Sequence, residues 1–454
     1  MTSIIVLVPE TGQVLLQKNV NSSNIPSITY LPMGGTFTYG QRFDVRLEKF
    51  KCEHHITSFL PVSEFIMIVA VQKNEVQVDE EHTYYMNCVI QDFAAGMVLL
   101  KGRNELSGAA FTSYDINLHT NRLQREFQMF TPFFEQLIRS SSAPSVLLNT
   151  CDFILSEKRK DLNELLEGFT ESCECLHACI MMGGKIVCGT SEWFKLIKIP
   201  EMRLIVSFVT SIYENTLSSI SDIPVYLPYT NPAAPIRLLR VQLMQDAMLC
   251  MLCENDVKIQ TVINQIEQIL ATKIDLIQGA LHIKDRCFPI QSQANAHVQA
   301  FCCYSRTTRL SVLSFNPHTN IASDSSVAAG ASRTMDKDTM RTYLCDFIKT
   351  NFEMIRMIDC QPSATSLTDN NTQGANASGE TPTSEEQMAK EVDSSEGPEN
   401  DMSELYWVKK GCKVFLLGVT NYIMIVLFNS ETPTYPMRSI STTLLESITS
   451  ASDF

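Results

Sequence analysis

The sequence predicts a protein of the α/β (α+β) class with three domains, each an antiparallel sheet flanked by helices. Apolar strands and tight turns alternate with amphipathic helices three times along the chain. The 454 residues also suit about three domains of ordinary size, and a hydrophobic content of 44% is enough for three cores. We place the domains at residues 1–140, 150–277 and 278–454, with Ser140–Pro144 as a linker between the first two.

The first domain opens with two apolar runs around a turn that ends in Gly12, a pattern typical of a hairpin. Its predicted strands are Ile4–Val8, Val14–Gln17, the alternating segment Phe43–Leu47 and the continuously apolar segment Phe65–Val71. Helical spacing of apolar residues follows, and it predicts two helices over about residues 79–100 and 118–138.

The second and third domains repeat this alternation. In the second we expect helices over about residues 158–175, 201–213 and 258–277, and strands at 178–182, 185–188, 238–243 and 247–253. In the third we expect strands at 298–304, 310–315, 406–408, 412–419 and 422–428, and helices over about 336–358 and 439–448.

An acidic segment, Gln361–Ser403, interrupts the third domain. It holds nine acidic residues and one lysine, so it contributes −8 to the net charge of −14, and it contains no aromatic residue. A segment of this composition cannot bury enough apolar surface to order itself. Because apolar strands follow it, we interpret it as a disordered insert within the third domain and not as a domain boundary.

Composition and charge exclude several classes of protein. A net charge of −14 argues against a nucleic-acid-binding protein, which needs basic surfaces. The longest apolar run, Val414–Phe428, is shorter than the roughly 20 residues that span a bilayer, so we expect no transmembrane segment. Residues 1–10 do not resemble a signal peptide, and most of the 15 cysteines sit in apolar runs, so we expect a cytoplasmic protein with buried, reduced thiols.

No catalytic, cofactor or metal motif is complete. The side chains of Cys173, Cys175, His177 and Cys179 would lie too far apart on a strand to meet at one ion, so we expect no metal. Cys250 and Cys253 form a CxxC pair within an apolar strand, without the helix start that activates a redox pair. Gly183-Gly184-Lys185 lacks the spacing of a phosphate loop and is interpreted as a hairpin turn. Trp193 is interpreted as core in preference to an interface anchor.

Several segments resemble the Fuzzy family of planar cell polarity effectors. These segments are Asp222–Leu239, Leu165–Phe169, Gly189–Phe194, Leu249–Cys253, Tyr39–Gln41, Ala95–Leu100, Thr432–Thr434 and Met437–Ser439. The resemblance covers most of the chain and is sharpest from Leu165 to Cys253, whereas the acidic insert departs from the family pattern. It implies three longin-type domains, in agreement with the three domains inferred from periodicity.

The resemblance also implies partners and a function. Fuzzy proteins pair with Inturned, a second tri-longin protein, and act with the WD-repeat protein Fritz in planar polarity and ciliogenesis, at basal bodies or the apical cell cortex. Related tri-longin pairs are exchange factors for Rab-type small GTPases. We therefore expect a non-enzymatic subunit of a heterodimeric exchange factor. The alternatives are an adaptor that recruits a GTPase or a trafficking protein and, more remotely, a cysteine-dependent enzyme.

The glycine-rich segment Met33–Gln41 supplies candidate interface residues, because in related exchange factors the first longin domains form the GTPase platform. Glycines permit close backbone approach and aromatic residues serve as anchors, so we select Phe37, Tyr39 and Gln41 as residues in or beside a partner interface. The competing interpretation is that Phe37 and Tyr39 point inward from the start of a strand.

Overall fold

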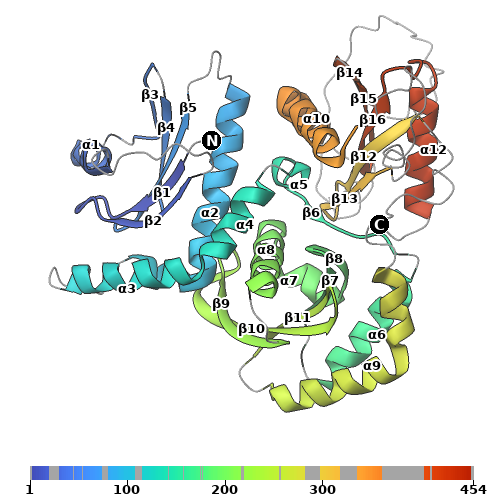
Figure 1. Ribbon diagram of the computed structural model, residues 1–454, viewed down its shortest axis with the longest axis horizontal. Helices are drawn as coiled ribbons and strands as arrows, with labels where there is room; N and C mark the ends of the chain where they lie inside the picture. Colours follow the sequence, from blue (N-terminus) through green and yellow to red (C-terminus); the bar gives the residue numbers. More distant parts are fainter. Residues whose placement is uncertain are drawn as a thin grey trace, which may run out of the picture.

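The structure is a computed structural model. It describes residues 3–19, 30–43, 45, 47–53, 55–73, 80–107, 115–141, 143–156, 158–173, 175, 177–215, 219–254, 257–281, 297–316, 335–359, 403–409 and 412–450. Three sheets follow one another along the chain, in blue, green and orange to red in Figure 1.

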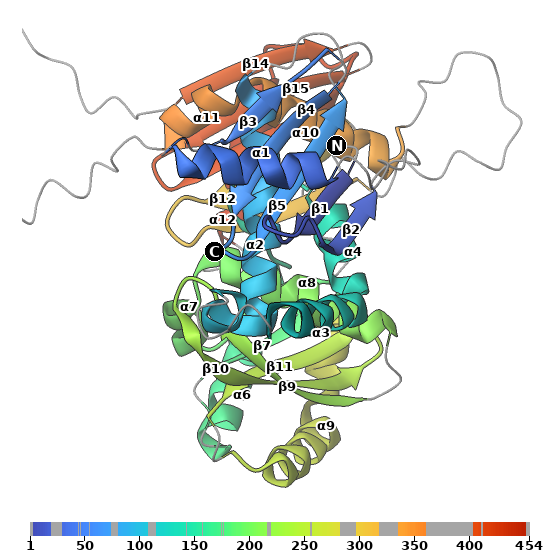
Figure 2. The ribbon, with the colours of Figure 1, turned by 90° about the vertical axis from the view of Figure 1, so that its left-hand side faces the viewer.

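The first sheet lies between two helices, as Figures 1 and 2 show. Alternation along the first strand sends Ile4 and Val6 to one face, with the second helix, and Ile5 and Leu7 to the other, beneath the first helix. The strands are β1 (Ser3–Leu7), β2 (Val14–Asn19), β3 (Lys49–Lys51), β4 (His55–Pro61) and β5 (Met67–Lys73), and the helices are α1 (Tyr30–Arg42), α2 (Glu80–Ser107), α3 (Asp115–Met129) and α4 (Thr131–Ser140).

The prediction for the first domain needs correction at several points. The described residues of Phe43–Leu47 form the connection from α1 to β3 and no strand, and β4 was not predicted. The glycine-rich segment is helical. The single helix expected over 118–138 is two helices, because Pro132 stands in the first turn of α4, where a residue without a backbone N–H is tolerated at a helix start.

The second sheet is packed between α8 on one face and α6 and α9 on the other side of the domain (Figure 1). Its elements are α6 (Arg159–Ser172), β7 (His177–Met182), β8 (Lys185–Gly189), α7 (Ser191–Leu196), α8 (Ile199–Asn215), β9 (Ile220–Leu227), β10 (Asn231–Met244), β11 (Ala247–Cys253) and α9 (Ile259–Leu281). The short helix α7 and the strand β9 were not predicted as such. Thr190 caps α7, because its Oγ1 accepts a hydrogen bond from the backbone N–H of Trp193 at 3.2 Å, and the fully buried Trp193 confirms the core interpretation.

The third domain contains β12 (Val298–Ser305), β13 (Leu310–Phe315), α10 (Lys337–Thr350), α11 (Phe352–Asp359), β14 (Ser403–Lys409), β15 (Cys412–Val419), β16 (Tyr422–Asn429) and α12 (Met437–Ser450). The helix expected over 336–358 is divided at Asn351. Apart from Ser403, the first residue of β14, the predicted acidic insert lies outside the described residues. Its two flanks, α11 and β14, both belong to the third domain.

All three sheets share one strand order. In each, two strands form a hairpin, three more form a meander, and the last strand pairs with the first. The orders are β2-β1-β5-β4-β3, β8-β7-β11-β10-β9 and β13-β12-β16-β15-β14. Helices follow the hairpin and the last strand in every case. The described chain thus repeats one β-β-α-β-β-β-α unit three times, and the predicted fold class is confirmed.

The expected linker Ser140–Pro144 is a buried connection instead. Pro144 begins the short helix α5 (Pro144–Leu147), whose described residues are all buried, and the strand β6 (Cys151–Asp152) then pairs in parallel with β13 of the third sheet. Phe153 forms an isolated bridge to Ile186 of β8 in the second sheet. These backbone hydrogen bonds join the second and third sheets, so the segment assigned to the second domain also completes the third.

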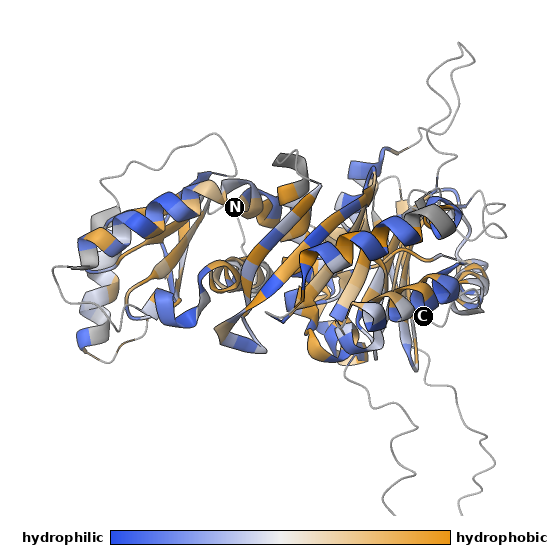
Figure 3. Cartoon of the chain, turned by 90° about the horizontal axis from the view of Figure 1, so that it is seen from below, coloured by the Kyte–Doolittle hydropathy of each residue, from blue (hydrophilic) through white to orange (hydrophobic). Residues whose placement is uncertain are grey.

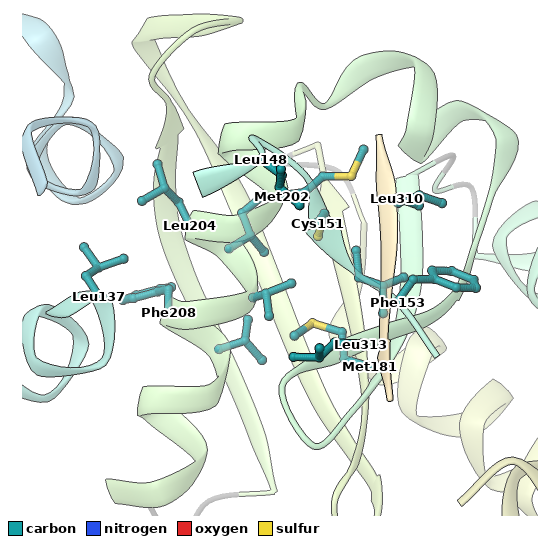
Figure 4. Close-up of a cluster of buried hydrophobic side chains, with 14 of the residues drawn as sticks. Leu137, Leu148, Cys151, Phe153, Met181, Met202, Leu204, Phe208, Leu310 and Leu313 are labelled. Atoms are coloured by element: carbon teal, nitrogen blue, oxygen red, sulfur yellow. The ribbon is translucent and has the colours of Figure 1, made fainter. Parts of the chain in front are cut away.

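Side chains from all three domains meet around this connection. Figure 4 shows Leu137 of α4 facing Phe208 of α8, with Cys151 and Phe153 beside Leu310 of β13. All five are less than 9% exposed. Figure 3 shows orange stripes along otherwise blue helices, as expected where one side of a helix is buried. The domains therefore share one continuous apolar core.

Candidate interaction surface on the first domain

Helix α1 forms in spite of its poor intrinsic propensity. Its sequence contains a proline and three glycines, residues that disfavour helix interiors. Met33 and Phe37, four residues apart, share one side of the helix and pack on the apolar face made by Ile5, Leu7 and Phe59. Burial of this side against the sheet therefore stabilises a helix that local sequence would not predict.

Two of the glycines permit close backbone contacts. A Cβ atom on Gly34 would lie 2.8 Å from the carbonyl oxygen of Pro9, and one on Gly40 would lie 2.9 Å from that of Val45. The carbonyl oxygen of Gly40 also accepts hydrogen bonds from the backbone N–H groups of Phe43, at 3.0 Å, and Val45, at 2.9 Å. Gly40 thus folds the chain back over the end of α1.

This reversal exposes a group of large apolar side chains. Tyr39, Phe43, Val45 and Phe50 have exposed fractions between 54% and 66%. The rings of Tyr39 and Phe43 contact each other, with centroids 4.8 Å apart. We call these four residues the α1 surface. Single exposed apolar side chains are common on proteins, whereas several gathered within twelve residues of sequence are typical of an interaction site.

Register places Phe50 on the same face of the sheet as α1. Phe50 pairs with Thr57, and Thr57 pairs with Val71, which belongs to the cluster under α1. Directly paired residues in an antiparallel sheet point to the same face. Phe50 therefore stands beside α1 at the edge of the sheet, where Figure 2 shows β3 next to the helix.

The strand β3 leaves one backbone edge of the first sheet without a neighbouring strand. Among the described residues, it pairs with β4 on one side only, and its three residues are all exposed. Lys49 and Lys51 flank Phe50, and charged residues on an edge strand oppose indiscriminate strand pairing. The aromatic residues of the α1 surface thus lie beside an open strand edge and two lysines.

The structure separates the three residues selected from sequence. Phe37 is 3% exposed and stacks on Phe59 with ring centroids 6.5 Å apart, so it belongs to the core. Tyr39 is 66% exposed, because residues two apart on a helix point in different directions. Gln41 lies in α1, and its side chain is outside the described residues. The competing interpretation, in which Phe37 and Tyr39 point inward from the start of a strand, is wrong for Tyr39. The role of all three residues at a partner interface stays a prediction.

Sequence reasoning missed Phe43, Val45 and Phe50. The alternation of Phe43, Val45 and Leu47 with polar residues predicted a half-buried strand, whereas the structure exposes the first two. The sequence did contain one relevant signal. Gly40 and the polar residues that follow it indicate the end of a secondary-structure element before Phe43.

The cysteines and histidines do not assemble a metal centre in the part of the chain that the structure describes. No group of three or more metal-binding side chains converges there. Cys175 and Cys253 come together, with their sulfur atoms 3.8 Å apart, although sequence reasoning had grouped Cys175 with its neighbours in the chain. Their hydrogen bond lowers the pKa of Cys175 and raises that of Cys253. Gly183 and Gly184 form the β7–β8 turn, with φ values of 53° and 73°.

Most of the other thiols are buried in the sheets. Loss of water around a thiolate raises the pKa of Cys151, Cys188 and Cys303 to about 12. Of the described cysteines, Cys52 is exposed and Cys88 is half-buried. Among the described helices, none has the length and apolar character that crossing a membrane requires.

Comparison with known proteins assigns the fold of the second domain. Residues 173–268, which run from the end of α6 into α9, match the family model described as the second longin domain of FUZ, MON1 and HPS1. Together with the thrice-repeated strand order, this match defines the class: the chain is a longin-domain protein with three longin-like domains.

Within that class, the chain is similar in sequence to several fuzzy homologues. The chain is 22% identical to a fuzzy homologue of Xenopus tropicalis over 366 residues, which are 80% of this chain and 78% of that protein. It is 25% identical to a rat fuzzy homologue over 51% of the chain and 54% of the relative, and 24% identical to a human one over 57% and 58%. The chain spans about half the length of these two mammalian relatives. The chain is thus similar to fuzzy homologues along most of its length.

Proposed function

We propose that this protein is a non-enzymatic subunit of a guanine-nucleotide exchange factor for a Rab-type small GTPase, formed with an Inturned-like tri-longin partner. In this proposal a Fritz-like WD-repeat protein joins the pair, and the assembly acts at basal bodies or the apical cell cortex in ciliogenesis and polarised trafficking. The similarity to fuzzy homologues supports the choice of pathway.

The α1 surface is the observation that carries the proposal. An exposed aromatic pair beside an open strand edge can bury apolar area and add backbone hydrogen bonds when a second protein docks. It lies on the first domain, the domain that the resemblance associates with the GTPase platform. Lys49 and Lys51 at its margin would favour an acidic partner surface.

Exchange requires binding and no covalent chemistry. An exchange factor binds the nucleotide-free GTPase more tightly than the nucleotide-bound form, and it thereby weakens the GTPase's hold on nucleotide and Mg²⁺. Only this difference in affinity shifts the GTPase from its nucleotide-bound to its nucleotide-free form. A shape-complementary surface on a rigid scaffold is therefore sufficient for exchange. The α1 surface is held on such a scaffold by the core beneath Phe37.

The test is release of a fluorescent guanine nucleotide from candidate Rab-type GTPases by the purified pair of subunits. We expect the pair to accelerate release, and the double substitution Tyr39→Ser with Phe43→Ser to abolish either pairing or acceleration. Leu118→Ser with Met129→Ser is the matched control, because these apolar residues are at least as exposed but lie on α3. A pair that accelerates release from none of the GTPases would refute exchange activity.

An adaptor that recruits a GTPase is the second candidate, because the same exposed surface suits simple docking. Nucleotide preference distinguishes the two functions. An adaptor binds the GTP form of its GTPase best, whereas an exchange factor binds the nucleotide-free form best. Pull-downs with the GTPase in each state, using the purified pair, measure this preference directly.

A further inference from the structure

A second candidate site lies between the second and third domains, away from the α1 surface. A cavity of about 570 Å³ that is partly open to solvent is lined by the α7–α8 corner, the turn between β12 and β13, and residues at the start of α6. Four cationic side chains line it, Arg159, Lys195, Lys198 and Arg309, and its described lining contains no carboxylate. This lining contrasts with the net charge of −14 for the whole chain.

Two of these cations pair with carboxylates that are not part of the lining. Lys195 pairs with Glu192 at 2.7 Å, and Arg309 pairs with Asp359 at 2.6 Å. Lys198 donates to the carbonyl oxygen of Tyr229 at 3.0 Å, which is an uncharged partner. The guanidinium of Arg159 lies 4.7 Å from the ring centroid of Phe153.

Negative charge close behind the cavity is already engaged. The carboxylate of Glu201 is buried, and it accepts hydrogen bonds from the backbone N–H groups of Lys198, Tyr229 and Thr230. Asp92 is paired with Arg203 at 3.1 Å. Neither carboxylate lines the cavity, so an anion inside it would face mainly cationic groups.

Uncharged donors complete the lining. Asn149 accepts a hydrogen bond from Arg203 through its Oδ1 atom, which leaves its amide NH₂ as a donor. Thr307 and Thr308 add hydroxyl groups from the β12–β13 turn. Asn149 and Arg309 have φ values of 51° and 57°, a strained conformation that tends to concentrate at binding sites.

We propose that this cavity binds a small anion that carries several phosphate groups. Converging lysine and arginine side chains form the strongest hydrogen bonds with phosphate oxygens, and a partly enclosed site screens these interactions less than open solvent does. A single phosphate would fill only a small part of a cavity of about 570 Å³ and so could contact only some of the four cations. This proposal is independent of exchange activity.

The test is calorimetric titration of the purified full chain with inositol hexakisphosphate as the probe. We expect binding that weakens with salt, and at least a tenfold loss of affinity in the variant Lys195→Glu with Lys198→Glu. Both lysines are exposed, so the fold should survive, and circular dichroism checks that it does. Arg125→Glu with Lys258→Glu is the control: it makes the same change in charge at exposed positions outside the cavity.

Two results would overturn the proposal: an absence of binding by the unmodified chain, or an equal loss of affinity in the cavity variant and the control. Sedimentation with phosphatidylcholine vesicles that contain phosphatidylinositol bisphosphate identifies the source of the phosphate. Capture of the chain that is lost in the cavity variant indicates a lipid headgroup, whereas binding of the soluble probe alone indicates a free anion.

Discussion

Phe37 and Tyr39 lie two residues apart on α1 and have opposite environments. Phe37 is 3% exposed under the helix, whereas Tyr39 is 66% exposed beside Phe43. Phe37 should therefore contribute mainly to the free energy of unfolding, and Tyr39 mainly to partner binding.

Phe37→Ser should lower the free energy of unfolding by about 3–5 kcal/mol, the range for removal of a buried aromatic side chain. Tyr39→Ser should change it by about 0.5 kcal/mol or less, as exposed substitutions do. Urea denaturation of each variant measures both values. Comparable losses in the two variants would contradict the placement of Tyr39 outside the core.

The cysteines should react at very different rates with a thiol reagent at pH 8. Burial holds the pKa of Cys151, Cys188 and Cys303 near 12, so at this pH roughly one in 10⁴ of each would be thiolate even if the reagent reached it. Cys52 is exposed and should be modified first. Mass mapping of labelled peptides measures the order, and rapid native labelling of Cys188 would favour a cysteine-dependent activity.

At the element scale, α2 joins the first domain to the second through a break at Gly102. Here φ is 68° and ψ is 161°, outside the helical range, and the ring of Tyr226 from β9 packs against the glycine. A Cβ atom at this position would lie 2.5 Å from that ring. The predicted helix over 79–100 ended just before this break, and the structure carries it on to Ser107.

Gly102→Ala should destabilise the protein by about 2 kcal/mol or more, because it forces alanine into a backbone conformation that is essentially restricted to glycine and displaces Tyr226. Gly168→Ala in α6 is the control. A Cβ atom there meets nothing within 4 Å, so that variant should gain about 0.5–1 kcal/mol from helix propensity. Thermal unfolding of the two variants should shift in opposite directions, and a neutral Gly102→Ala would contradict the contact.

On the scale of the whole molecule, three copies of one unit share a core. The segment from α5 to Phe153 hydrogen-bonds to the second and third sheets, and the ion pair between Arg203 of α8 and Asp92 of α2 ties the second domain to the first. We therefore expect the domains to unfold together and not one by one.

The acidic insert should be dispensable for this architecture. Its composition offers little apolar area to bury, and its flanks, α11 and β14, lie in the same domain. Replacing residues 362–401 with a short Gly-Ser linker should leave stability unchanged within about 1 kcal/mol, since loop closure depends only weakly on length. Differential scanning calorimetry and co-purification with the partner subunit measure the outcome. A large loss of either stability or pairing would show that the insert has a structural role.

Periodicity in the sequence determined most of the fold. The hairpins at Ile4–Gln17 and Ala178–Cys188, the central strand near Val69 and the strands from Cys412 to Phe428 all match the structure, because alternation and continuous apolar runs directly encode which faces are buried. The resemblance to the Fuzzy family, carried by segments such as Asp222–Leu239, was confirmed by comparison with its members.

Only the tertiary structure decided which residues form the candidate surfaces. Helix α1 exists because Met33 and Phe37 bury against strands distant in sequence, which overrides the low helix propensity of its glycines. The cavity between the second and third domains combines Arg159, Lys198 and Arg309, which lie up to 150 positions apart. Local patterns report the burial of each segment, whereas the convergence of separate segments depends on how the three sheets pack.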